Sequence, residues 1–256
     1  MGIYRNPLYY EVVFSFFDVK KQIDAFEAII ERFSKVRVKR VLDVACGPSL
    51  QLIELARRGY KSIGLDIAPE MLAHLSERAK EEDLRIETVK ADMCAFKLKR
   101  KVDFAFVMMG SLVTDSDAKL LSHLDSVAAA LRSGGLYFIQ NKAVDWTHIE
   151  EQKWTMERGG ITVDTTFNAC WKNIVNQTYT EKLTLKVNDH GKTIKLESEE
   201  DLKFVFPQEF KTLITLSSKF EFLGWWEGTE STWFLDKPLD KAKTPSNFNM
   251  VLLRRK

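Results

Sequence analysis

The chain has 256 residues, of which 45% are hydrophobic and 29% charged, a balance typical of a folded globular chain rather than a disordered one. Its 38 Lys and Arg nearly cancel its 36 Asp and Glu, and the resulting net charge of +2 disfavours nucleic-acid binding through a large basic surface. No run approaches the roughly 20 apolar residues that cross a bilayer, so we expect no membrane partner.

From the N-terminus, the first half of the chain alternates between helix and strand patterns. Apolar residues at helical spacing predict a helix over 20–33, and a short apolar run over 39–47 is typical of a buried strand. Further helices are predicted over 49–58, 69–80 and 116–132, and further strands over 60–67, 85–92, 102–110 and 136–141. Ser133, Gly134 and Gly135 should form the turn before the last strand. This alternation predicts an α/β fold with a doubly wound, Rossmann-like, mostly parallel sheet.

The pattern changes near residue 145. Residues 154–206 alternate between apolar and polar positions, with hairpin-turn residues at 159–160 and 189–191, so we expect an inserted antiparallel β-sheet. A helix should follow Pro207, and strands over 220–227 and 248–256 should flank a polar loop over 236–247. The predicted parts are a helical cap (1–34), an α/β domain (35–144 and 206–256) and the inserted sheet (145–205).

Cysteine and histidine give no sign of metal or disulfide chemistry. The three cysteines, at positions 46, 94 and 170, form no C-x-x-C pair, which favours a reducing compartment, and we expect a cytoplasmic location. The four histidines lack metal-ligand spacing, so no metal site is expected.

Acidic residues stand at the ends of three successive predicted strands. Asp43 precedes a tight turn at Gly47, Asp66 ends the second strand and Asp92 ends the third. The carboxyl ends of parallel strands share one edge of a sheet, where an acid can accept hydrogen bonds from a ribose diol. Each acid alone has an ordinary alternative as a turn or capping residue. The turn lacks the G-x-G-x-x-G pattern of a dinucleotide site, so a nucleotide-dependent oxidoreductase is the weaker alternative.

The segments DVACGPS, GLDIAPEML, ADM and LRSGG together resemble the class I S-adenosylmethionine-dependent methyltransferases over roughly residues 20–141. The inserted sheet is similar to that of amino-sugar and glycine-type N-methyltransferases. The resemblance implies S-adenosylmethionine as cofactor, S-adenosylhomocysteine as its product, and a small-molecule methyl acceptor. The family's usual Gly-Thr-Gly or Gly-Ser-Gly loop is here Gly47-Pro48-Ser49, which leaves a non-catalytic or regulatory cofactor-binding protein of the same fold as an alternative.

The resemblance also implies where the cofactor binds. Asp43 would anchor the loop beside the methionine part, Asp66 would hold the ribose diol, and Asp92 would bind the adenine amino group. The other implied cofactor contacts are Ala45, Cys46, Gly47, Ile67, Met71, Met93 and Met108. For the methionines, ordinary core filling is the alternative.

The resemblance implies that a tyrosine, either Tyr9 or Tyr10, closes over the sulfonium and the acceptor, and we expect Asn141 and Trp146 to be walls of the acceptor pocket. An aromatic face suits a sulfonium, although Tyr10 could equally anchor an N-terminal helix. No catalytic base stands out, so transfer would depend mainly on proximity and orientation. The inserted sheet would act as a lid over the acceptor or, alternatively, as the interface of a homodimer.

Overall fold

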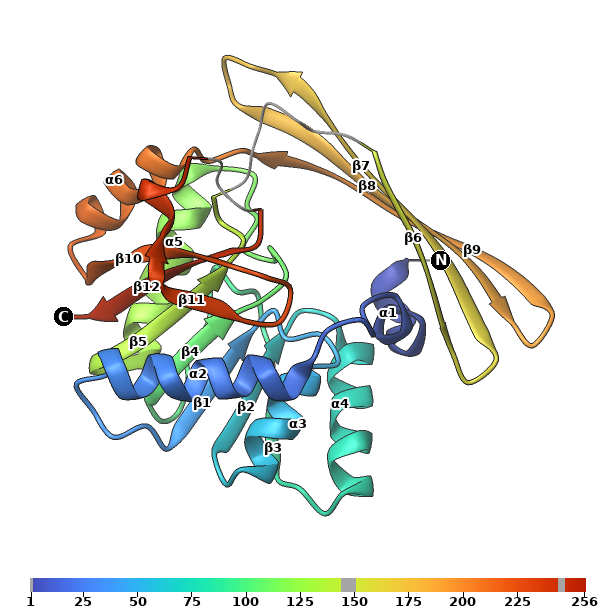
Figure 1. Ribbon diagram of the computed structural model, residues 1–256, viewed down its shortest axis with the longest axis horizontal. Coiled ribbons are helices and arrows are strands. Elements are labelled where there is room, and N and C mark those ends of the chain that lie inside the picture. The colour runs from blue at the N-terminus through green and yellow to red at the C-terminus, as the bar shows by residue number, and fades with distance from the viewer. Residues whose placement is uncertain (1, 144–150, 244–246) are drawn as a thin grey trace.

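The computed structural model describes residues 2–143, 151–243 and 247–256. Its central sheet has eight strands in the order β11-β10-β12-β5-β4-β1-β2-β3, and the first five strands along the chain run parallel (Figure 1). The fold class predicted from the sequence is therefore confirmed. Strand bounds are β1 Arg40–Val44, β2 Lys61–Asp66, β3 Ile86–Lys90, β4 Val102–Val107, β5 Leu131–Gln140, β10 Phe220–Gly228, β11 Trp233–Pro238 and β12 Asn249–Arg255.

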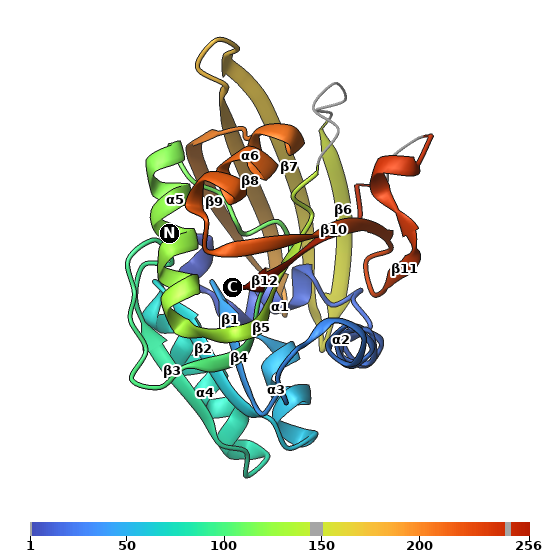
Figure 2. The ribbon, with the colours of Figure 1, turned by 90° about the vertical axis from the view of Figure 1, so that its left-hand side faces the viewer.

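Helices cover both faces of this sheet, because each has one apolar stripe to bury. One face carries α2 (Val19–Phe33), α3 (Leu50–Arg57) and α4 (Pro69–Glu81), which share a core with the sheet residues Phe104, Phe106 and Phe138. The other face carries α5 (Asp117–Ala130) and α6 (Pro207–Ser217). Figure 2 shows α5 and α2 on opposite sides of the central strands. Among the described residues, no helix is both long and apolar enough to cross a membrane.

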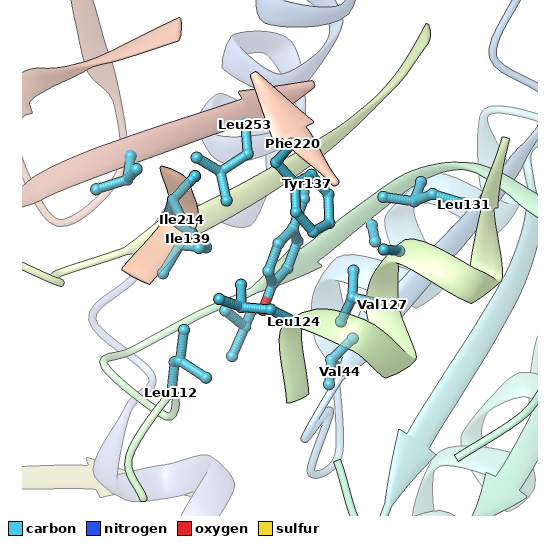
Figure 3. Close-up of a cluster of buried hydrophobic side chains, with 14 of the residues drawn as sticks. Val44, Leu112, Leu124, Val127, Leu131, Tyr137, Ile139, Ile214, Phe220 and Leu253 are labelled. Carbon is cyan, nitrogen blue, oxygen red and sulfur yellow. The ribbon is translucent and has the colours of Figure 1, made fainter. Parts of the chain in front are cut away.

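The second core is built around Tyr137 of β5, which is fully buried among residues of α5, α6 and β12 (Figure 3). Its hydroxyl lies 2.7 Å from Nε2 of the buried His123. His123 Nδ1 lies 2.9 Å from the carbonyl oxygen of Met93, which can only accept, so Nδ1 carries the proton and Nε2 accepts from the tyrosine. This chain of hydrogen bonds ties α5 to the segment that follows β3.

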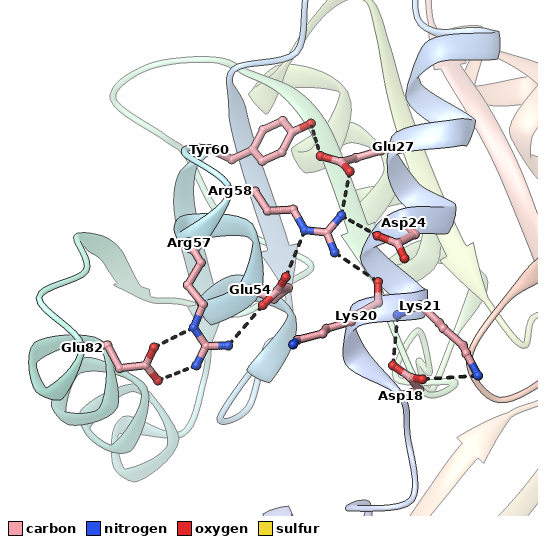
Figure 4. A network of polar contacts seen from close by, with 10 residues as sticks. All are labelled: Asp18, Lys20, Lys21, Asp24, Glu27, Glu54, Arg57, Arg58, Tyr60 and Glu82. Atoms are coloured by element: carbon pink, nitrogen blue, oxygen red, sulfur yellow. Dashed lines mark hydrogen bonds and ion pairs between the residues drawn. The ribbon is translucent and has the colours of Figure 1, made fainter.

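A polar network fastens the helices of the opposite face to one another (Figure 4). The Arg58 guanidinium, just after α3, pairs with Asp24 and Glu27 of α2, each at 2.7 Å, and with Glu54 at 3.0 Å. Arg57 makes a bidentate pair with Glu82 at the end of α4, both bonds being 2.7 Å. These contacts fix the positions of α2, α3 and α4 relative to one another. They lie at the end of the helices that is far from the carboxyl edge of the sheet.

A second, antiparallel sheet follows β5 and stands over the first. It is a meander of β6 (Gln152–Arg158), β7 (Ile161–Asn173), β8 (Thr178–Asp189) and β9 (Lys192–Lys203). At the N-terminus, the short helices η1 (Ile3–Arg5) and α1 (Pro7–Val13) pack under it, with Val12 and Val13 in one apolar cluster with Val163 and Leu185. Figure 1 shows α1 between this sheet and α4. The N-terminal segment thus joins the two sheets.

Three details differ from the expectations. The predicted turn Ser133–Gly135 lies inside β5 as a bulge, since Val102 pairs with Leu131 but Phe104 pairs with Leu136. A Cβ on Gly135 would come within 2.6 Å of the Asp103 carbonyl oxygen, so the bulge requires glycine there. The predicted loop over 236–247 begins inside a third C-terminal strand, β11. A third hairpin, over 174–177, was not anticipated.

Candidate cofactor and acceptor site

The sequence-predicted acids lie along one edge of the central sheet. β1, β2 and β3 are neighbours and parallel, so Asp43, Asp66 and the turn that holds Asp92 are at the same carboxyl ends. The order of the strands reverses between β1 and β4, which makes this edge the topological switch point of the sheet. Ligands of open α/β sheets bind at such a point.

The loop after β1 is held by both acids. Asp43 Oδ2 accepts a 2.6 Å hydrogen bond from Ser49 Oγ, and Ser49 Oγ in turn accepts from the Leu52 N–H at the start of α3. Asp66 Oδ2 accepts from the Gly47 N–H at 2.7 Å, and its Oδ1 accepts from the Ala68 N–H at 2.8 Å. Each Asp66 oxygen keeps a lone pair, because a carboxylate oxygen can accept more than one hydrogen bond.

Left-handed backbone is concentrated at this edge. Ala45 (φ 56°), Gly47 (φ 53°) and Ser49 (φ 33°) follow β1, Met109 (φ 57°) follows β4 and Asn141 (φ 53°) follows β5. Such conformations are costly for residues other than glycine and are typical of sites where the fold must present backbone to a ligand. This feature could not be seen in the sequence, because four of the five residues are not glycine.

Two acids, Asp43 and Asp66, lie close enough at this edge to influence each other electrostatically. Burial raises the pKa of Asp43 well above its ordinary value, the Ser49 hydroxyl lowers it in part, and the charge of Asp66 raises it again. Two carboxylates held this close repel each other when both are ionised. A cationic ligand beside them would offset that repulsion.

The residues predicted to contact the adenine or the methionine part of the cofactor differ in exposure. Ile67 is 66% exposed, so its face is open, whereas Met71 and Met108 are buried. Asp92 is exposed and caps its own turn, accepting from the Cys94 N–H at 2.7 Å. Met93 is held through its carbonyl by His123. The buried Cys46 donates its thiol to the Gly47 carbonyl and is shielded from solvent, and burial raises its pKa well above the ordinary thiol value.

Beside this edge lies a cavity of about 880 Å³ between the two sheets. It is lined by the N-terminal Tyr4 and Tyr10, by the ends of β4 and β5, and by the inner face of β6–β9, including Trp154, Tyr179 and Glu181. A Cβ built on Gly47 would lie 3.9 Å from Tyr10 Cε1, so the Tyr10 ring stands between the cofactor loop and the cavity. This volume suits a small-molecule ligand.

Of the predicted acceptor residues, Tyr10 and Asn141 line the cavity. The Asn141 side chain is also tied to β12, since its Oδ1 accepts from the Asn249 N–H at 3.2 Å. The predicted Trp146 lies outside the described residues.

Gln140, Glu181 and Glu200 also line the cavity, although they are not among the residues predicted from the sequence. Gln140 ends the buried strand β5 and is 1% exposed. Its Oε1 accepts from the Met109 N–H at 2.8 Å, which fixes the amide orientation, and its Nε2 has no partner among the described residues. In the sequence, Gln140 is a polar residue at the end of an apolar run. Glu181 stands at an alternate position from Leu183 and Leu185, so a strand places all three on the same face.

Comparison with known proteins agrees with this geometry. Residues 41–135 match the family model described as a methyltransferase domain. A protein of Geobacillus sp. (strain WCH70) named as a methyltransferase is 26% identical over 93 residues, and that match spans 35% of this chain and 38% of the relative's length.

Among solved structures, an S-adenosylmethionine-dependent methyltransferase from Clostridium acetobutylicum superposes with a TM-score of 0.74 at 13% identity, covering 96% of each chain. The sugar N-methyltransferase KedS8 from Streptoalloteichus gives 0.70 at 19% identity, covering 93% of this chain and 89% of the other. The S-adenosylmethionine-bound amino pentose methyltransferase CalS10 from Micromonospora echinaspora gives 0.67 at 17% identity, covering 92% of each. At these identities the likeness shows a shared fold, which includes both sheets.

Proposed function

We propose that this chain, which carries an S-adenosylmethionine-dependent methyltransferase domain of class I, moves the methyl group of that cofactor to a small-molecule acceptor. The observation that carries the proposal is the cavity of about 880 Å³ that adjoins the carboxyl edge of β1 and β2 across Tyr10. A cofactor edge with a second cavity beside it is what a group-transfer reaction needs.

The residues of the edge fit the cofactor. Asp66 would hold the ribose diol with the lone pairs left by the Gly47 and Ala68 bonds. The loop over 44–49 would present backbone to the methionine part, and Ile67 would pack on the adenine. The paired acids Asp43 and Asp66 favour a ligand with positive charge, and this cofactor has both an ammonium and a sulfonium. When bound, it supplies an electrophilic methyl group.

The chain's own part in transfer would be to place the acceptor and to exclude water. Tyr10 and Tyr4, whose ring centroids are 6.0 Å apart, would close the cofactor side of the cavity. Their faces suit a nearby sulfonium. Among the described residues, no histidine lines the cavity. Orientation of the acceptor would therefore contribute most of the rate.

The size of the cavity and its position between the two sheets support a small acceptor rather than a macromolecule. The antiparallel sheet would roof the acceptor, with residues 1–34 as a cap on the cofactor side, and a roofed cavity does not admit a duplex. The sugar and amino pentose methyltransferases of similar fold support an acceptor of that size. We also propose a cytoplasmic location, because all three cysteines are free.

Calorimetry followed by a labelling experiment tests the proposal. S-adenosylmethionine and S-adenosylhomocysteine should bind the purified protein, and NAD should give no heat. With the ¹³C-methyl cofactor and a metabolite extract, mass spectrometry should then find the label in small molecules and not in the RNA or protein fractions. Saturable NAD binding without binding of either methionine nucleoside would overturn the cofactor assignment, and label confined to RNA or protein would overturn the acceptor class.

A further inference from the structure

A second cavity, of about 520 Å³, lies at the amino ends of the parallel strands, on the edge of the central sheet opposite the cofactor edge. It is lined by six cations and one acid: Lys39, Arg40, Lys61, Arg100, Lys101, Arg132 and Asp103. None of these residues has a part in the proposed methyl transfer. The cavity therefore calls for an explanation of its own.

Strand pairing brings these cations together from separate parts of the sequence. Arg40 and Lys61 stand opposite each other at the starts of β1 and β2. Arg100 and Lys101 directly precede β4, which is the neighbour of β1 on its other side. Arg132 lies at the start of β5, in the bulge beside β4. Because like charges repel, collecting them at one place destabilises the folded chain unless anions are bound there.

The one acid of the lining already has its partners. Asp103 is 1% exposed, and its Oδ2 accepts from the backbone N–H groups of Lys39 and Arg40, each at 2.9 Å. Its Oδ1 lies 3.2 Å from Arg132 Nη1. Asp103 therefore fixes the start of β1 and balances the charge of Arg132. The other five cations of the lining are left without an acid inside the cavity.

These five cations have little compensation outside the cavity either. Four of them form no ion pair and no side-chain hydrogen bond within the part of the chain that the structure describes: Lys39, Lys61, Arg100 and Lys101. The fifth, Arg40, has its Nη2 3.8 Å from Glu87 Oε2, which is beyond hydrogen-bond distance. The Arg40 side chain is only 16% exposed, and a cation so far removed from water is costly without a hydrogen-bonded anion.

The neighbouring sequence adds to the positive potential of the cavity. Residues 35–40 and 97–101 contain eight Lys and Arg and no Asp or Glu, in a chain whose net charge is only +2. The two segments are held together, because Asp103 accepts from the backbone of Lys39 and Arg40. Charges of one sign that converge on a concave surface raise the local concentration of the opposite ion. This face of the molecule should therefore attract anions.

We propose that the cavity binds a compact oligophosphate, in which phosphate groups are linked in a short chain. Arg40 holds one phosphate group through its planar guanidinium, and the lysines and Arg100 neutralise the others. A single phosphate carries a charge of about −1.5 to −2, which is too little for five cations. A nucleic acid would need cations spread along its backbone, whereas these converge on one cavity. The inference is independent of the proposed function.

Calorimetry with inorganic tripolyphosphate tests the assignment on the full chain at physiological ionic strength, where weak surface pairs are screened. We expect one site per chain, and an affinity about tenfold or more above that for orthophosphate. ATP, added with the cofactor edge saturated in S-adenosylhomocysteine, distinguishes the sources of the phosphate chain. Tighter binding of ATP than of tripolyphosphate would identify a nucleotide, and similar affinities would identify a free oligophosphate.

Substitutions locate the binding in the cavity. Arg40→Gln should weaken tripolyphosphate by about tenfold or more, because it removes a bidentate charged donor. The double variant Lys61→Gln/Lys101→Gln changes two exposed side chains, so it tests the same site even if Arg40→Gln fails to fold, and it should also weaken binding. Lys186→Gln is the matched control, since Lys186 is exposed on β8 of the inserted sheet, far from this edge in the topology, and should change nothing.

Two results would overturn the proposal. One is an affinity for tripolyphosphate that no cavity variant lowers, or that Lys186→Gln lowers equally. The other is a short single-stranded RNA that binds more tightly than tripolyphosphate and loses affinity in the same variants, because the basic face would then be a nucleic-acid surface. S-adenosylhomocysteine should bind every folded variant as it binds the unaltered protein. If it binds none of them, the proposed function is wrong while the oligophosphate site stands on its own titration.

Discussion

Asp66 has two tasks in this site, and they can be separated by experiment. Its carboxylate fixes the loop through Gly47 and the start of α4 through Ala68, and it is also the predicted ribose ligand. A carboxylate accepting hydrogen bonds from a diol contributes roughly 1.5–3 kcal/mol. We therefore expect cofactor affinity to be sensitive to changes at Asp66.

We predict that Asp66→Ala weakens S-adenosylhomocysteine binding by about tenfold or more. Calorimetry measures the affinity, and circular dichroism checks that the fold is retained. Asp92→Ala is the comparison: its carboxylate is exposed and would make one contact to the base that water can replace, so the loss should be smaller. Equal affinities of Asp66→Ala and the unaltered protein would mean that the ribose lies elsewhere.

His123 offers a second prediction at the residue scale. Burial lowers its pKa from 6.5 to about 4, and the hydrogen bond from its ring to the Met93 carbonyl offsets only part of that shift. Between these two pH values the unfolded chain binds a proton that the folded chain does not. The stabilisation from neutral His123 is therefore complete above about pH 6.5 and is lost as the pH falls toward 4.

The free energy of unfolding should thus fall by roughly 2–3 kcal/mol more between pH 7 and pH 4 in the unaltered protein than in His123→Gln. Urea unfolding at a series of pH values measures the difference between the two proteins. Tyr137→Phe keeps the histidine and should retain the pH dependence. Parallel pH profiles for the unaltered protein and His123→Gln would contradict the assignment.

At the scale of elements, one buried carboxylate joins three parts of the fold. Glu11 of α1 has a side chain that is 2% exposed and pairs with Arg78, with His74 Nε2 at 2.9 Å and with Arg158 Nη1 at 2.8 Å. His74 and Arg78 belong to α4, and Arg158 ends β6. Burial raises the pKa of Glu11, but the bonds from Arg78 and His74 outweigh burial and lower it overall. The junction therefore fixes α1 against both sheets.

We predict that Glu11→Gln lowers the free energy of unfolding by roughly 2–3 kcal/mol, because it leaves the cations facing a neutral group. Glu70→Gln is the control on the same helix as Arg78: its pair with Arg5 is exposed and 3.9 Å long, so the loss should be below about 0.5 kcal/mol. Thermal unfolding gives both values. Limited proteolysis should cut the segment between α1 and α2 faster in Glu11→Gln than in the unaltered protein, and Glu70→Gln should show no such increase.

Periodicity predicted most of these elements because each has one apolar face against a common core. The exceptions depended on contacts distant in sequence. The bulge at Ser133–Gly135 exists because Gly135 lies against the Asp103 backbone, and β11 exists because Gly228 and Trp226 of β10 pair with it. In the same way, the acids at the strand ends were visible in the sequence, whereas the free amide of Gln140 depends on the Met109 N–H, 31 positions away.

At the scale of the whole molecule, the arrangement of the two sheets shapes the cavity between them. The apolar residues Val163, Leu185 and Val187 bury one end of the inserted sheet against α1, and the cavity lies under the rest of its inner face. The outer face carries the lysine and glutamate pairs. We interpret the sheet as a roof over the acceptor, and the alternative is that its outer face forms a homodimer interface.

Two tryptophan substitutions on neighbouring positions of β7 separate these interpretations. Side chains alternate along a strand, so Ala169 faces the cavity and Asn168 the outer surface. Ala169→Trp should fill the space beside Glu181 and lower methyl transfer to the labelled acceptor by about tenfold or more, with S-adenosylhomocysteine affinity unchanged. Asn168→Trp should leave transfer as it is.

Light scattering on both variants supplies the other half of the test. Under the roof interpretation, neither substitution changes the molar mass, and only Ala169→Trp loses transfer. If Asn168→Trp instead dissociates an oligomer while Ala169→Trp still transfers methyl groups at the normal rate, the outer face is the working surface and the roof interpretation is wrong. The two variants can separate the interpretations because neighbouring residues of a strand point to opposite faces, so Ala169 and Asn168 probe the cavity and the outer surface.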